Sequence, residues 1–351
     1  MKKLIFCFDG TCNHPADNED YVSDTSITNI VKLHLLLAGD LNNPSAANEQ
    51  PQTSFYYSGV GTYGSWLSRA FNSVFAPEFA DVKTILAQAQ QDLAFYAEQD
   101  VEVFIFGFSR GAALARRFAA SISHHVAFLG VFDTVAAIGL TDLNATTRPA
   151  SDVVFENGSL SDNVRHAVHL VALDERRLAF QPTLFNQSEN VLEVWFAGAH
   201  SDIGGGFWFD GLSDITLSFM MQQAYLAGLE FLQPNDIDFS RLNDDHGLSI
   251  GADDIDIVPL IDGVLHDLHR SQKMARQTLA PRQLCVHNND LPATDLIPVI
   301  HHSVLERINS VTAYRPASLR NQTYQIYLPS GELSDVKTGI ADLRLPRNNQ
   351  C

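Results

Sequence analysis

The sequence predicts an α/β protein whose core is a mostly parallel sheet with helices on both faces. Short apolar segments with strand character alternate with longer segments of helical periodicity, an order typical of βα units. Residues 101–116 combine an apolar strand, the turn Gly-Phe-Ser-Arg-Gly and a helix of small residues. Polar residues also follow several predicted strands, at the edge where open parallel sheets hold their active sites.

The N-terminal part of the chain contains two predicted strands and one helix. Residues 3–8 are apolar after Lys3 and stop at Asp-Gly-Thr, so we predict a strand that ends in a turn. Apolar residues recur at helical spacing over 26–37, which predicts a short amphipathic helix. Residues 39–53 are rich in Asn, Pro and Ser and are expected to form a loop before a second strand at 54–57.

The middle of the chain continues the alternation of helices and strands. Residues 82–97 place their apolar side chains on one stripe, which predicts a helix. The apolar run 101–108 is the strand that precedes the serine turn and its small-residue helix. A further apolar run at 125–132 predicts the next strand, and this strand ends at Asp133.

Regular patterns become sparser after this point. Residues 163–176 are expected to form a helix, 190–196 a strand, and 215–229 another helix. From about residue 234 the pattern is irregular and acidic, with one expected helix at 258–275. We therefore expect a single domain with a decorated C-terminal third.

Length and composition fit one domain over residues 1–351. The net charge of −18 and the pI of about 5.0 exclude binding to nucleic acid and polybasic docking on anionic lipid. No apolar run approaches the roughly 18–20 residues of a membrane span. The N-terminus reaches Asp9 too early for a signal peptide, so we expect a protein that is cytoplasmic as synthesised. Secretion by a route without a signal peptide stays open.

The motif around Ser109 predicts a nucleophilic serine. Between a strand and a helix, this motif lifts the serine above the sheet on a sharp turn. Gly107 and Gly111 leave room where side chains would collide, and the helix dipole favours negative charge that develops at its N-terminus. The alternative is a purely structural turn, because small residues are common in turns.

Asp133 and His200 are the expected partners of Ser109. The chain order Ser, Asp, His is that of the α/β-hydrolases, and all three residues follow predicted strands. His200 is preferred because glycines at 198 and 204–206 flank its loop and allow the backbone to approach a ligand. Other histidines lie in runs beside apolar segments: His124, His125, His301 and His302. His200 is expected to act as the base, with Asp133 orienting it.

Two further aspartates near these strand ends are alternatives. Asp174 is a candidate acid that would otherwise form an ion pair with Arg176 or Arg177. Asp202 lies two residues after His200 and is expected to brace the loop through backbone amides. Contact between Asp202 and the imidazole is the other interpretation.

Acyl transfer also requires N–H donors that stabilise an oxyanion. One donor is expected from Arg110, the residue after the serine, and the second from Gly10 or Thr11 after the first strand. Asp9 is interpreted as a brace that caps Thr11 or Cys12, or as a further candidate acid. No cofactor or metal is expected, because no cluster of His, Cys and Asp shows zinc-ligand spacing.

The sequence also has features of two other classes of protein. Cys7-Phe-Asp9-Gly-Thr11 resembles the first motif of HAD phosphatases, but the position of the nucleophilic aspartate holds Cys7. Phosphoryl transfer therefore lacks its nucleophile. The other alternative is a non-catalytic binding protein that keeps the serine turn as scaffold; fluorophosphonate labelling of Ser109 distinguishes it from a hydrolase.

Several sequence blocks are longer than the serine motif alone. They are Phe8-Asp-Gly-Thr-x-Asn13, Gly59–Thr62, Gly107–Ala112, Gly130–Val135, Ala172–Arg177, Trp195–Gly206, His302–Arg307 and Tyr314–Pro316. Together they resemble the DUF2235 family, which contains the catalytic domain of Tle1-type phospholipase effectors of the bacterial type VI secretion system. The resemblance implies an α/β-hydrolase fold, a Ser–Asp–His triad, phospholipid acyl-ester hydrolysis, and a secretion-system or immunity protein as partner.

Two apolar stretches are candidates for binding an acyl chain. Phe207, Trp208 and Phe209 directly follow the His200 loop and are expected to contact substrate. Residues 66–79 have apolar side chains at helical spacing and fit either a lid or an ordinary core helix. We expect a lipid or ester substrate, with phospholipid first and soluble carboxylic esters as the alternative.

Overall fold

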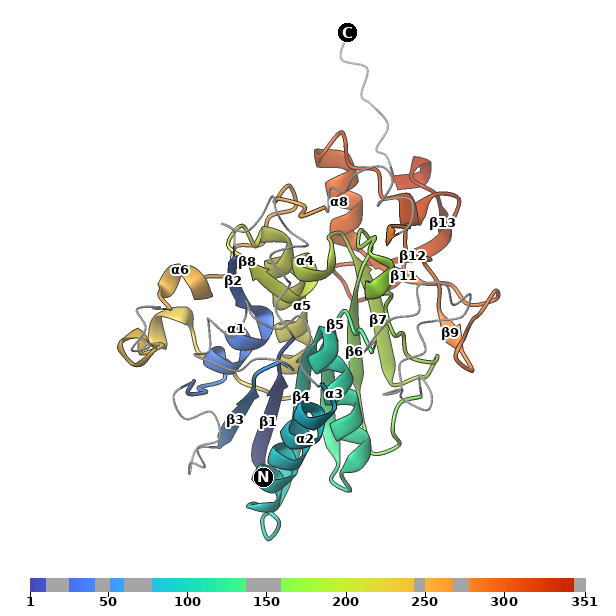
Figure 1. Ribbon diagram of the computed structural model, residues 1–351. Helices are drawn as coiled ribbons and strands as arrows, with labels where there is room; N and C mark the ends of the chain where they lie inside the picture. The colour runs from blue at the N-terminus through green and yellow to red at the C-terminus, as the bar shows by residue number, and fades with distance from the viewer. Residues whose placement is uncertain are drawn as a thin grey trace.

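The computed structural model describes residues 1–10, 25–41, 51–59, 78–136, 159–242, 250–267 and 278–343. It shows a nine-stranded sheet in the order β13-β12-β11-β7-β6-β5-β4-β1-β3 (Figure 1). Neighbouring strands are parallel except for β12 and β13, which confirms the predicted α/β class. The strands are β1 Lys2–Phe8, β3 Gln52–Tyr57, β4 Val101–Phe108, β5 Val126–Phe132, β6 Ala167–Ala172, β7 Val191–Phe196, β11 Val299–His301, β12 Thr323–Tyr327 and β13 Lys337–Thr338.

Helices cover both faces of this sheet, and two short ribbons lie outside it. The helices are α1 Asn29–Leu36, α2 Glu78–Ala94, α3 Ser109–Ser121, α4 His200–Gly204, α5 Gly211–Leu226, α6 Ala252–Ile255 and α8 His302–Ser310. The first ribbon pairs β2 Thr25–Thr28 with β8 Gly205–Phe207, and the second pairs β9 His287–Asn288 with β10 Leu291–Pro292. The β2–β8 ribbon therefore connects the segment before α1 to the segment after His200.

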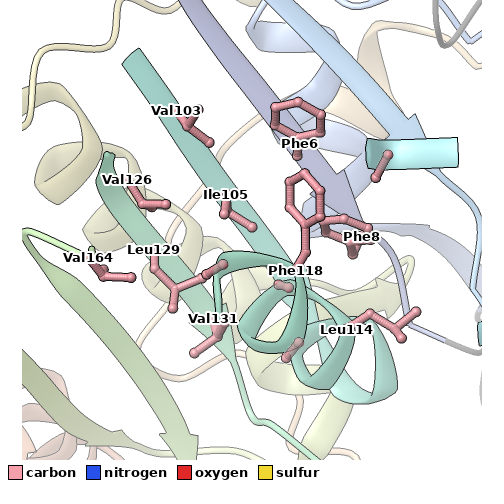
Figure 2. Close-up of a cluster of buried hydrophobic side chains, with 14 of the residues drawn as sticks. Phe6, Phe8, Val103, Ile105, Leu114, Phe118, Val126, Leu129, Val131 and Val164 are labelled. Atoms are coloured by element: carbon pink, nitrogen blue, oxygen red, sulfur yellow. The ribbon is translucent and has the colours of Figure 1, made fainter. Parts of the chain in front are cut away.

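Strand β1 shows how the sequence builds two hydrophobic layers. Successive side chains of a strand point to opposite faces of the sheet. Phe6 and Phe8 join the cluster beneath α2 and α3, where Phe118 of α3 packs on both rings (Figure 2). Ile5 and Cys7 join the cluster on the opposite face, which α1 and α5 cover. Both layers are buried, so β1 is apolar from Leu4 to Phe8.

The C-terminal third adds strands β11, β12 and β13 to one edge of the sheet. Strand β11 pairs in parallel with β7, and β12 then pairs with β11. A third hydrophobic cluster, which includes Trp195, Ile300, Val304 and Tyr324, joins this part to β7. Helix α8 and strands β12 and β13, drawn in orange to red in Figure 1, lie together at this end of the sheet.

The helix expected over 163–176 is wrong, because β6 occupies Ala167–Ala172 at the centre of the sheet. All six residues of β6 are buried, so the strand lacks the polar alternation that distinguishes a half-exposed strand. The helix expected over 258–275 is also absent from the described residues 258–267. Residues 268–275 lie outside the described part of the chain.

Other predicted elements differ only at their ends. The helix expected over 26–37 begins at Asn29, because Thr28 caps it: Thr28 Oγ1 accepts a hydrogen bond from the Val31 amide at 3.3 Å. The residues before this cap form β2. Across the described residues, no helix is both long and apolar enough to cross a membrane.

Candidate active site

Five adjacent strands bring polar residues to one edge of the sheet. Asp9 follows β1, Ser109 follows β4, Asp133 follows β5, and Asp174 lies two residues beyond β6. His200 follows β7 after a three-residue turn. Parallel strands end on the same side of a sheet, so residues far apart in sequence converge there.

Ser109 occupies a strained turn between β4 and α3. Its φ of 57° lies in the left-handed region, which residues with a Cβ rarely adopt. A Cβ on Gly111 would lie 2.3 Å from the carbonyl oxygens of Phe8 and Asp9, and one on Gly107 would lie 2.6 Å from Ala112 Cα. The glycines therefore let α3 pack closely on the strand ends and hold Ser109 at the helix N-terminus.

His200 and Asp133 form a buried pair beside this turn. His200 Nδ1 lies 2.5 Å from Asp133 Oδ2, and both side chains are at most 1% exposed. His200 begins α4, and the rings of Phe108 and Phe180 flank its imidazole with centroids at 4.7 and 5.0 Å. Among the described residues, His200 Nε2 has no hydrogen-bond partner, so its bond to Ser109 Oγ is not formed in this structure.

Arg282 is the residue that the sequence analysis missed. Its guanidinium donates to both oxygens of Asp133, at 2.6 and 2.8 Å. Burial raises the pKa of Asp133, but Arg282 and His200 outweigh burial and hold that pKa well below its usual value. Arg282 lies in a stretch without strand or helix periodicity, so no local pattern singled it out.

A second buried ion pair lies next to His200. Glu175 accepts hydrogen bonds from Arg177 Nε at 2.9 Å and Arg177 Nη2 at 2.8 Å, and from the His200 amide at 3.2 Å. Burial raises the pKa of Glu175, but Arg177 outweighs it and the net effect lowers this pKa to about 2. The expected pairing of Asp174 with Arg176 or Arg177 is therefore not formed. Arg176 lies 3.3 Å from Asp267 instead.

Asp174 fixes the turn that precedes His200. Its carboxylate accepts hydrogen bonds from the Gly198 amide at 2.8 Å and from the Tyr314 hydroxyl at 2.7 Å. Gly198 has a φ of 134°, which is why glycine occupies this position. Burial raises the pKa of Asp174 to about 6. Asp133, not Asp174, is the carboxylate that reaches the His200 imidazole.

Asp202 braces the other side of the same loop. It accepts hydrogen bonds from the Ala199 amide at 2.9 Å and the His266 amide at 3.1 Å. Its second oxygen lies 2.6 Å from His266 Nδ1. The histidine partner of Asp202 is thus His266 rather than His200.

The turn after β1 differs from the arrangement expected for an oxyanion donor. The Gly10 amide donates to Asp9 Oδ1 at 2.7 Å. Asp9 also accepts hydrogen bonds from the hydroxyls of Thr28 at 2.8 Å and Tyr56 at 2.7 Å, and burial raises its pKa to about 6. Arg110 follows Ser109 in the first turn of α3. Thr11 and Cys12, the expected capping partners, lie outside the described residues.

The three consecutive aromatic residues after the His200 loop divide between interior and surface. Phe207 is buried, and its ring stacks on His266 with a centroid distance of 3.8 Å. Trp208 and Phe209 are 48% and 61% exposed. Most of the apolar stretch at 66–79 lies outside the described residues. In the described ranges, no group of three or more His, Cys, Asp or Glu is placed to hold a metal ion.

Several known proteins are partly similar to this chain. An uncharacterized protein of Saccharomyces cerevisiae, YEL023C, is 24% identical over 248 residues, covering 52% of this chain and 33% of that protein. A crystal structure of an uncharacterized Pseudomonas aeruginosa protein has a TM-score of 0.39 and 19% identity, covering 67% of this chain and 47% of the other. The structure of the Tle1 effector bound to the VgrG spike of the type 6 secretion system has a TM-score of 0.38 and 23% identity. It covers 59% of this chain and 51% of the other. This chain spans one third to about half the length of these proteins.

A family model gives the stronger result. The model for the catalytic domain of Tle1-like phospholipase effectors of the type VI secretion system matches residues 2–125 and 119–223. The matched segments span more than half of the chain and contain Ser109, Asp133 and His200. The chain therefore belongs to the family of type VI secretion Tle1-like phospholipase effector catalytic domains.

Proposed function

We propose that this protein is a serine hydrolase that cleaves acyl esters of phospholipids. Ser109 is the nucleophile, His200 the general base and Asp133 the acid that orients the base. The observation that carries the proposal is the pair of His200 Nδ1 and Asp133 Oδ2, 2.5 Å apart, beside a strained serine at the N-terminus of α3. The same three residue types perform acyl transfer on several unrelated folds.

The proposed reaction uses both nitrogens of His200. Asp133 holds the proton on Nδ1, which leaves Nε2 as the acceptor. Nε2 is buried and makes no hydrogen bond within the described ranges, so it is available for the proton of Ser109 Oγ. Oγ attacks the ester carbonyl, Nε2 returns the proton to the leaving alcohol, and water then hydrolyses the acyl-enzyme by the reverse proton transfers.

The oxyanion formed by this attack needs N–H donors. Helix α3 directs its N-terminal amides, including that of Arg110, toward the strand ends. In the proposed site Arg110 supplies the first donor. Gly10 supplies a second donor only after its amide leaves Asp9 Oδ1, so substrate binding must rearrange the turn after β1.

Phospholipid is the substrate favoured by family membership and by the surface beside the site. Exposed Trp208 and Phe209 follow α4, which begins with His200, by only a few residues. An apolar surface of this kind is suited to an acyl chain, because burying each CH₂ contributes about 0.8 kcal/mol. The family also favours a secretion-system or immunity protein as a partner, which co-purification would test.

Fluorophosphonate labelling combined with an ester panel tests the proposal. We expect wild-type protein to be labelled at Ser109 and to hydrolyse dispersed phospholipid. Ser109→Ala should lose labelling and about 10⁴–10⁶ in kcat while staying folded. Ser121→Ala, at the other end of α3, is the matched control and should keep full activity.

Two outcomes would contradict the proposal in different ways. Substantial turnover by folded Ser109→Ala protein would exclude Ser109 as the nucleophile. Hydrolysis of acetyl and butyryl esters without hydrolysis of phospholipid would instead identify a carboxylesterase that acts on soluble esters.

A further inference from the structure

Arg282 enters the proposed site from the C-terminal third of the chain. It is 2% exposed, and its Nη1 and Nη2 atoms lie 2.6 and 2.8 Å from the two oxygens of Asp133. A two-pronged contact between guanidinium and carboxylate fixes the carboxylate plane as well as its position. The oxygen that bonds His200 is therefore aimed by Arg282.

The same guanidinium connects other segments that surround the imidazole. Nη1 also donates to the Ala172 carbonyl at 3.0 Å, at the end of β6, and Nη2 donates to the Phe180 carbonyl. The Phe180 ring packs edge-on against His200. Arg282 thus joins the end of β5, the end of β6 and the Phe180 turn around a single side chain.

Arg282 also changes the charge that His200 meets during the reaction. In a Ser–His–Asp site the carboxylate stabilises the imidazolium that forms when the serine is deprotonated. Here Arg282 already offsets the charge of Asp133, so the protonated His200 shares a buried cluster with a second cation. A second cation that offsets the charge of Asp133 weakens the stabilisation of the imidazolium and favours the neutral imidazole that acts as a base.

The other charged groups near His200 largely balance one another. Glu175 and Arg177 form their own ion pair beside the His200 amide. On α4, Asp202 is paired with His266. Burial lowers the pKa of His200, Asp133 raises it, Arg177 lowers it and Glu175 raises it, and the net direction is downward. Arg282 contacts Asp133 directly, so its effect on His200 passes through that carboxylate.

We propose that Arg282 is a positioning residue of the proposed hydrolase, which clamps Asp133 and keeps His200 neutral at mildly acidic pH. The effect of Arg282 on the rate of ester hydrolysis rests on the proposed function. The proton affinity of His200 does not, because it is measurable without turnover. The two ideas can therefore fail separately.

The test is a histidine titration by NMR with ¹³C-labelled imidazoles, with the His200 signal assigned by its loss in His200→Gln. We expect the wild-type His200 signal to titrate below the ordinary value of 6.5. Arg282→Gln should raise that midpoint by at least about one pH unit. Arg282→Lys keeps the positive charge but loses the two-pronged contact with Asp133. It should therefore hold the His200 midpoint near that of wild type and lower kcat.

Arg307→Gln is the matched control, since Arg307 is also buried but donates to the Ile261 and Gly263 carbonyls. It should leave the His200 midpoint unchanged. If Arg282→Gln does not fold, Arg282→Lys decides, because a kcat equal to that of wild type would show that the two-pronged contact with Asp133 is not needed. A wild-type midpoint at or above the ordinary value, or an Arg282→Gln midpoint equal to wild type, overturns the role of Arg282.

The activity measurement separates the two proposals. In the pH profile of kcat/KM for a short ester, the midpoint of the fall at acidic pH should move together with the His200 midpoint measured by NMR. If the midpoint moves but Ser109 is never labelled by a fluorophosphonate, the electrostatic role of Arg282 holds and the hydrolase proposal fails. If labelling occurs and the midpoint does not move, the hydrolase proposal holds and Arg282 only supports the fold.

Discussion

Ser109 concentrates the local strain of the site in one residue. Its φ of 57° is costly for a side chain with a Cβ, by about 1–2 kcal/mol. Glycine relieves that strain and alanine keeps it. We therefore expect Ser109→Gly to be more stable than Ser109→Ala by about 1 kcal/mol in urea unfolding, with both variants inactive. Equal midpoints would show that the turn is not strained.

The aspartates near His200 should differ sharply in their effects on rate. Asp133→Asn leaves Arg282 without its counter-charge and lets the imidazole adopt the wrong tautomer, so kcat should fall by on the order of 10⁴. Asp174→Asn and Asp202→Asn remove loop contacts, and they should lower stability more than kcat. Steady-state kinetics with a short ester measures kcat for each of the three variants. A larger loss of kcat in Asp202→Asn than in Asp133→Asn would reassign the acid.

Local sequence patterns predict some residues of the candidate site and do not indicate the others. Ser109, Asp133 and His200 each follow an apolar strand, so their convergence could be predicted without coordinates. Arg282 has no such marker, because its partner Asp133 lies 149 positions away and the interaction depends on how the C-terminal third docks. The Gly10 amide was predicted to face a substrate, but a neighbouring carboxylate competes for it.

At the scale of helices and strands, burial explains which elements can be predicted from the sequence and which cannot. Helix α2 was recognised because one stripe is apolar and the rest is polar. Strand β6 was not, because its apolar residues are buried on both faces and their spacing also fits a helix. Strands β11 and β13, with only three and two residues, are too short to show a period.

The loop between β8 and α5 should determine how activity depends on acyl chain length. If Trp208 and Phe209 bind the chain, each added CH₂ should raise kcat/KM about fourfold until the surface is filled. Trp208→Ser combined with Phe209→Ser should flatten that dependence and spare short esters. A series of p-nitrophenyl esters measures it.

The control for this loop is a second exposed pair of apolar residues, on the helix that follows the loop. Tyr225 and Leu226, 65% and 73% exposed, lie at the far end of α5. Tyr225→Ser combined with Leu226→Ser should leave the chain-length dependence intact. A dependence that survives loss of Trp208 and Phe209 would place the acyl site elsewhere.

For the molecule as a whole, buried histidines set part of the pH dependence of stability. His34 is buried, its Nδ1 lies 2.8 Å from Ser54 Oγ, and burial lowers its pKa to about 4. The folded protein therefore binds this proton more weakly than the unfolded chain. The contribution of neutral His34 to the free energy of unfolding is full above pH 6.5 and is lost as pH falls through about 4. Buried Asp9, with a pKa raised to about 6, has the opposite effect: its contribution is full below 3.8 and is lost as pH rises through 6.

A variant comparison isolates the histidine. The free energy of unfolding of wild type should exceed that of His34→Gln most at pH 7.5. This gap should narrow by roughly 3 kcal/mol as pH falls to 4, since each unit of pKa shift corresponds to about 1.36 kcal/mol. Urea unfolding at several pH values measures it, and His125→Gln, at an exposed position, is the control. A gap that does not change with pH would show that His34 binds protons equally in both states.

The contact between Asp133 and Arg282 also has a consequence during synthesis of the chain. The two residues are 149 positions apart, so translation at about 5–20 residues per second separates them by roughly 7–30 seconds. A nascent chain that already contains Ser109, Asp133 and His200 still lacks the arginine that neutralises its buried carboxylate. The order of translation therefore delays completion of the site until the C-terminal third has been made and has docked.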